Sequence, residues 1–81
     1  MTKLNEQTDP VVLREKAQWY SEILELEPSS KIFFPYAKLL VQLNRQQEAA
    51  TVLMAGLDRH PEFSEARLFL ISLLMSSTES V

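Results

Sequence analysis

His60 is the residue whose type best suits catalysis or metal binding, because it is the single histidine of the chain. An imidazole can act as a general base or as a metal ligand near neutral pH. However, the chain has no cysteine and no second histidine that could complete a metal site. His60 also stands just before Pro61, at the expected end of a helix, where a partial positive charge is favourable. We therefore expect His60 to be structural and the protein to hold no metal.

The other reactive side chains do not form a catalytic pattern either. Glu22, Glu25 and Glu27 are close in sequence, but on a helix they are best interpreted as a solvated face. A serine nucleophile needs a histidine that is held by a carboxylate, and no spacing in this chain indicates such a group. With Gly56 as its only glycine, the chain also lacks a glycine-rich phosphate loop. We expect no enzyme activity and no cofactor.

Length and charge limit the class of protein further. With 81 residues the chain has room for one domain, and its net charge of −3 comes with scattered lysines and arginines, which predicts no nucleic-acid partner. The longest apolar stretch, Leu68 to Met75, is far too short for the roughly 30 Å core of a bilayer. Residues 1–9 are polar and do not resemble a signal peptide. A soluble, cytoplasmic protein without a membrane partner is expected.

The spacing of apolar residues predicts an all-α fold. A single glycine argues against a sheet protein, since hairpin turns need glycine. Leu13, Ala17, Tyr20 and Leu24 follow one another at spacings of four, three and four, which is one face of a helix. Comparable patterns predict three more helices, so that residues 10–76 form an antiparallel helix–turn–helix array of about four helices. Residues 1–9 and 77–81 are expected to be polar tails.

The predicted helix boundaries depend on polar residues and prolines. Pro35 either lies in the first turn of the second helix at little cost or removes one backbone bond and bends the chain there. Residues 44–47 are polar and predict a tight turn. The residues expected to cap helices are Asp9 or Thr8 for the first, Ser29 or Ser30 for the second, and Ser64 for the fourth.

An internal repeat organises these helices. Three positions recur at an offset of 33 residues: Tyr20, Leu24 and Pro28 return as Leu53, Leu57 and Pro61. A period of this length fits a helix–turn–helix unit.

The central copy reads Phe33-x2-Tyr36-Ala37-x2-Leu40, then Ala49-x3-Leu53, then Gly56 and Pro61. This pattern resembles the tetratricopeptide repeat, a 34-residue pair of helices with small residues where the helices approach closely. The copy before it supplies a second helix, with Lys16 in the place of the small alanine. The copy after it supplies a first helix, Arg67-x2-Leu70-Ile71-x2-Leu74. The resemblance therefore covers a half, a whole and a half repeat.

The resemblance implies that the first helix of each unit lines a concave groove. The groove residues are then Lys31, Phe34, Lys38, Val41 and Gln42 from the second helix and Glu65, Leu68, Ser72 and Met75 from the fourth. We expect this basic and apolar strip to bind a peptide segment of a partner protein. The alternative is a solvent-facing strip that binds nothing.

The fourth helix carries more apolar residues than its neighbours can cover. Seven of the eight residues from Leu68 to Met75 are large and apolar, and a helix that is apolar all round needs cover on more than one side. We expect it to meet a second copy, a partner or a continuation of the array, through Leu68, Ile71, Leu74 and Met75. The predicted function is a protein–protein interaction module, such as a scaffold, adaptor or chaperone-like module. The alternative is a structural unit that homo-oligomerises through this helix.

Overall fold

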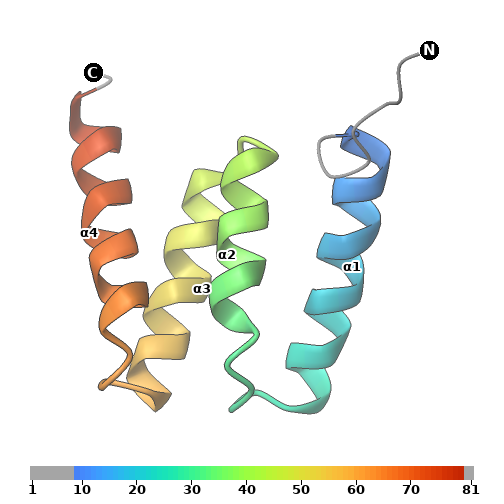
Figure 1. Ribbon diagram of the computed structural model, residues 1–81, viewed down its shortest axis with the longest axis horizontal. Coiled ribbons are helices and arrows are strands. Elements are labelled where there is room, and N and C mark those ends of the chain that lie inside the picture. The colour runs from blue at the N-terminus through green and yellow to red at the C-terminus, as the bar shows by residue number, and fades with distance from the viewer. Residues whose placement is uncertain (1–8, 80–81) are drawn as a thin grey trace.

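The structure, a computed structural model that describes residues 9–79, is a row of four antiparallel α-helices (Figure 1). The helices are α1 (Pro10–Leu26), α2 (Phe33–Gln42), α3 (Gln46–Arg59) and α4 (Ser64–Glu79). The most extensive packing is between α2 and α3, while α1 packs on α2 and α4 packs on α3. As a result α1 and α4 lie at opposite ends of the row (Figure 1). All regular elements within residues 9–79 are helical, which confirms the predicted all-α class with four helices.

The start of α1 follows the prediction. Asp9 is the N-cap, and its Oδ1 accepts a hydrogen bond from the Val11 amide at 3.0 Å. Pro10 occupies the first helical position, where an amide hydrogen would have no partner within the helix. Thr8, the other predicted cap, lies outside the described residues.

The hydrogen bonds at the start of α2 show which of the two expected positions Pro35 takes. Pro35 is the third residue of the helix, and the first α-helical bond is donated by the next amide, Tyr36, to the Ile32 carbonyl at 3.0 Å. The proline therefore lies in the first turn and removes no bond of the helix. Ser30 Oγ accepts a hydrogen bond from the Ile32 amide at 3.2 Å, but Ile32 itself is the N-cap and α2 has no side-chain cap. The prediction of a serine cap is wrong, because the hydroxyl stabilises the turn before the helix instead.

The turn between α2 and α3 depends on Asn44, which has a φ of 62°. The Arg45 amide donates to the Leu40 carbonyl at 2.8 Å, and the Asn44 amide donates to the Val41 carbonyl at 3.0 Å. These two bonds form a Schellman motif, which satisfies the last carbonyl groups of α2. Asparagine is among the few residues other than glycine that adopt the left-handed conformation readily.

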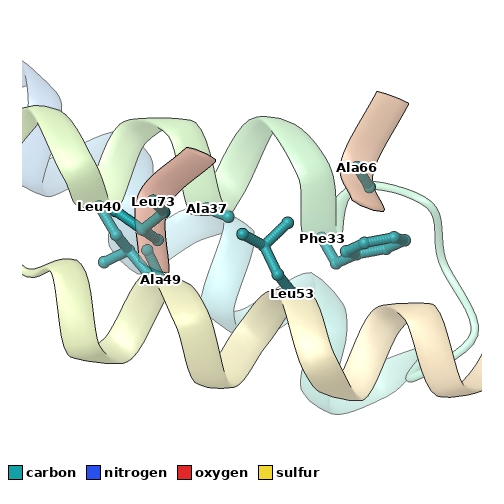
Figure 2. Close-up of a cluster of buried hydrophobic side chains, with 7 residues drawn as sticks. All are labelled: Phe33, Ala37, Leu40, Ala49, Leu53, Ala66 and Leu73. Atoms are coloured by element: carbon teal, nitrogen blue, oxygen red, sulfur yellow. The ribbon is translucent and has the colours of Figure 1, made fainter. Parts of the chain in front are cut away.

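The main core lies between α2 and α3 and is completed by two residues of α4 (Figure 2). It contains most of the residues that carry the repeat pattern. Its buried members are Phe33, Ala37 and Leu40 of α2, Ala49 and Leu53 of α3, and Ala66 and Leu73 of α4.

Gly56 makes the closest contact in this core possible. A Cβ atom on Gly56 would overlap the ring of Phe33, which is almost completely buried. The ring of His60 stacks on Phe33 with centroids 6.0 Å apart, and Phe63 meets Phe33 edge to face at 5.5 Å. Phe33 is therefore enclosed by the α3 backbone on one side and by two rings on the others.

A second, smaller cluster attaches α1 to α2. Leu13 and Ala17 of α1 are buried against Leu39 of α2. Beside them, Tyr20 packs edge to face on Tyr36 with centroids 6.3 Å apart. One face of α1 is thus covered by α2.

Both ends of α4 differ from the prediction. The helix begins at Ser64, and the Ser64 hydroxyl donates to the Glu62 carbonyl at 3.5 Å, so that it does not cap the helix. At the other end α4 continues to Glu79, so residues 77–79, which were expected in the polar tail, are helical. The tails expected at residues 1–8 and 80–81 lie outside the described residues.

Gly56→Leu should destabilise the fold. We expect the free energy of unfolding to fall by about 3 kcal/mol, because the side chain must displace the buried Phe33 ring. This loss exceeds the gain of about 1 kcal/mol from removing a glycine inside a helix. Urea denaturation followed by circular dichroism measures the change. Ala55→Leu, one residue earlier on the exposed side of α3, is the matched control and should change stability by less than about 0.5 kcal/mol. Equal stability of Gly56→Leu and wild type would contradict the close contact.

Asn44→Val should lower the free energy of unfolding by about 1–2 kcal/mol, because a β-branched residue is strained at positive φ. Asn44→Gly should be within about 0.5 kcal/mol of wild type, since glycine adopts this conformation freely. The same denaturation experiment measures both. If both variants lost the same stability, the cause would be the amide side chain and not the backbone conformation.

Candidate protein-binding surface

The side of α4 that faces away from α3 is apolar and open. We name it the α4 outer face and define it by Leu68, Ile71, Leu74 and Met75, which are 65%, 46%, 49% and 61% exposed. The opposite side of the helix carries Ala66 and Leu73, which are buried in the core. At 100° per residue, Leu68, Ile71 and Met75 fall within one narrow arc opposite these two residues, and Leu74 widens it. The helix is therefore apolar on two sides, of which only one is covered.

The size of this face is notable for a small domain. Four large aliphatic side chains, each about half exposed, leave open an apolar area on the order of 400 Å². Patches of this size on a monomer are often functional. From residue 68 to residue 76 the helix carries no charged side chain, so no charge interrupts the patch. The α4 outer face is thus a contiguous apolar surface with a polar residue, Ser72, at its edge.

The predicted groove strip is divided in the structure. Lys31 and Glu65 lie together beside a shallow hollow of about 300 Å³, which Phe63 also lines. Val41 instead lines a different hollow, of about 640 Å³, between the α2–α3 turn and the second half of α4. Gln42 and Ser72 are exposed.

Phe34, the aromatic residue predicted for the groove, is engaged by neighbours within the chain. Its ring meets Phe63 at 5.2 Å and Phe69 at 5.8 Å, both edge to face. Lys38 Nζ lies 4.4 Å from the centroid of the same ring, a cation–π arrangement. Phe34 is consequently half-buried and links α2 to α4, and Lys38 covers it.

Sequence reasoning missed the part played by Phe63. This residue precedes α4 in a short connection, so it belongs to no periodic pattern, and yet it contacts both Phe33 and Phe34. Its position two residues after Pro61, before a run of apolar residues, is the one signal that the sequence offered.

A second exposed apolar stripe lies on α1, at the other end of the row. Trp19 and Leu26 are 56% and 84% exposed, and they share one helix face with the half-buried Val12 and Ile23. We name this set the α1 stripe. It is turned by about 130° from Leu13 and Ala17, the pair that packs on α2. Each end of the row therefore presents apolar side chains to solvent.

His60 has a structural environment. Its Nε2 donates a hydrogen bond to the Ser29 carbonyl at 2.6 Å, and its ring stacks on Phe33. Its Nδ1 lies 3.8 Å from a carboxylate oxygen of Glu62. The side chain thus joins the connection after α1 to the connection after α3.

The described part of the chain offers neither a metal site nor a membrane span. Within residues 9–79, no group of three histidine, cysteine or acidic side chains could hold a metal ion. None of the four helices over this range is both long and apolar enough to cross a bilayer. The features that stand out are accordingly the two apolar surfaces, the α4 outer face and the α1 stripe.

Known proteins give no further guide to these surfaces. No family model matches the chain, and neither the curated proteins nor the solved structures contain a match.

Proposed function

We propose that this protein is a protein–protein interaction module, a scaffold or adaptor without enzyme activity, whose α4 outer face binds a segment of a partner protein. The observation that carries the proposal is the exposure of four large aliphatic side chains on one side of α4. Isolated apolar residues on a surface need no explanation, but a contiguous uncharged patch does.

The size of the patch indicates how much a partner could gain. At about 25 cal/mol per Å², covering an area on the order of 400 Å² stabilises a complex by roughly 10 kcal/mol before the costs of association. This figure is comparable to the total stability of a small domain. Only the part of this figure that exceeds the costs of association appears as binding free energy.

The shape of the patch favours a helical partner. Leu68, Ile71 and Met75 are spaced by three and four residues, so they form a straight ridge of about two turns. A second amphipathic helix can pack its apolar side along such a ridge, with i, i+3, i+4 and i+7 residues as anchors. The predicted groove contributes less, because the Phe34 ring already has partners within the chain.

Leu68→Glu/Met75→Glu should weaken partner binding while the fold persists, since both side chains are more than half exposed. The wild type and the double variant are used as baits in lysate of the source cells, and each enriched protein is then purified and titrated. We expect at least about a tenfold weaker affinity for the double variant, because apolar anchors dominate such interfaces.

Two further variants make this experiment specific. Met54→Glu places the same charge on an exposed apolar residue of α3, away from the α4 outer face, and should bind like wild type. Phe34→Ala/Lys38→Glu tests the predicted groove and should weaken binding by less than the α4 variant does. Partners that bind the double α4 variant and the wild type with equal affinity would contradict the proposed surface.

A further inference from the structure

The internal repeat shows what α4 lacks. When α4 is aligned with α2, Ile71 and Leu74 take the positions of Ala37 and Leu40, an offset of 34 residues. Ala37 and Leu40 are fully buried, and they lie in the core between α2 and α3. Ile71 and Leu74 are about half exposed. Ile71 and Leu74, one part of the α4 outer face, therefore occupy the positions that α3 covers on α2.

The same comparison shows what α1 lacks. At the offset of 33 residues α1 aligns with α3, and Ile23 takes the position of Gly56, which is buried under Phe33 of α2. Ile23 is half-buried, and Trp19 and Leu26, its neighbours in the α1 stripe, are exposed. Ile23 of the α1 stripe thus lacks the cover that α2 gives to Gly56, and the α4 outer face lies on the helix that aligns with α2.

We propose that the α4 outer face docks onto the α1 stripe of a second copy of this chain, so that the two helices repeat between chains the antiparallel contact that α2 and α3 make within one. The inference deepens the proposed function and rests on it, because it names the partner of the α4 outer face as another copy.

The available area suits a weak but specific interface of this kind. A standard interface buries about 800 Å² on each partner, and some 56–65% of that area is apolar, or roughly 450–520 Å². The α4 outer face offers an area on the order of 400 Å², slightly below this standard. The tryptophan and three aliphatic residues of the α1 stripe form a face of comparable length. An interface below the standard size is typical of weak or transient association.

Charges at the rim of this contact are complementary. In the register of the α2–α3 pair, Arg67 takes the place of Phe33 and meets Ile23 of the second copy. Glu22 and Glu27 flank Ile23, and both are exposed. The C-terminal end of α1 also carries the negative end of the helix dipole, which favours a nearby cation. The positive charge of Arg67, which takes the place of the Phe33 ring in this alignment, is therefore complementary to Glu22 and Glu27.

The positions of the two surfaces determine the form of the assembly. Because α1 and α4 lie at opposite ends of the row (Figure 1), one copy can use both surfaces at once with two different neighbours. Such a head-to-tail contact is heterologous and adds copies as concentration rises. A two-fold contact of α4 with α4 would cover the α4 outer face but leave the α1 stripe open.

Two variants that each remove one surface test the pairing. Ile71→Glu places a negative charge within the α4 outer face, and Trp19→Glu places one within the α1 stripe. Both substitutions replace side chains that are about half exposed. Circular dichroism melts verify that both variants fold, and Met54→Glu serves as the matched surface control. Sedimentation velocity is measured for each protein alone and for an equimolar mixture of Ile71→Glu and Trp19→Glu.

The wild type and Met54→Glu should grow in mass from monomer to dimer and beyond as concentration rises from the micromolar to the millimolar range, because an interface below the standard size is weak. Each interface variant alone should remain a monomer. Their mixture should form a one-to-one dimer that grows no further, because Ile71→Glu still offers the α1 stripe and Trp19→Glu still offers the α4 outer face.

Three results would overturn the inference. The first is a wild type that stays monomeric over this range, and the second is a mixture of the two variants that remains monomeric. The third is a Trp19→Glu variant that dimerises alone, because this result indicates α4-to-α4 pairing. None of them removes the proposed function, which depends on the affinity of purified partner proteins for the Leu68→Glu/Met75→Glu variant.

Discussion

The close approach of the Phe33 ring to the Gly56 backbone is the contact on which the rest of the structure depends. It brings α2 and α3 near enough for Ala37, Leu40 and Leu53 to be fully buried between them. A small domain buries a modest share of its surface and is therefore only marginally stable. The tightly packed pair of α2 and α3 must supply much of that stability. The stacked ring of His60 closes this contact from the connection that follows α3.

One tight pair in the middle leaves the outer helices with cover on one side only. α1 is attached through Leu13 and Ala17, and α4 through Ala66 and Leu73, while the α4 outer face and Trp19 and Leu26 of α1 are exposed to solvent. Helical repeats generally bury their apolar faces by stacking on neighbours, and terminal units need a polar outer side to remain alone. Here each end of the row also exposes large apolar side chains, and this exposure is the physical basis of the proposed interaction function.

Much of the fold could be predicted from the sequence, because helix periodicity and the small residues of the repeat describe packing directly. The predicted positions from Phe33 to Gly56 supply most of the core. The serine caps could not be predicted, because a hydroxyl near a helix start can also bond within the preceding turn, as Ser30 and Ser64 do. The environment of Phe34 could not be predicted either, since it depends on Phe63, which lies in a connection without a pattern. Which protein covers the α4 outer face depends on molecules outside the chain, and sequence periodicity carries no information about them.

The central claim is that the α4 outer face is covered when the protein is at work, and the chain contains its own control for this claim. Met75 on α4 and Met54 on α3 are 61% and 54% exposed, so peroxide should oxidise them at similar rates in dilute purified protein. Mass spectrometry after brief peroxide treatment of intact cells measures the same two rates under working conditions. If the α4 outer face is covered in cells, Met75 should be oxidised several-fold more slowly there than Met54. Equal rates for the two methionines in cells would contradict the claim.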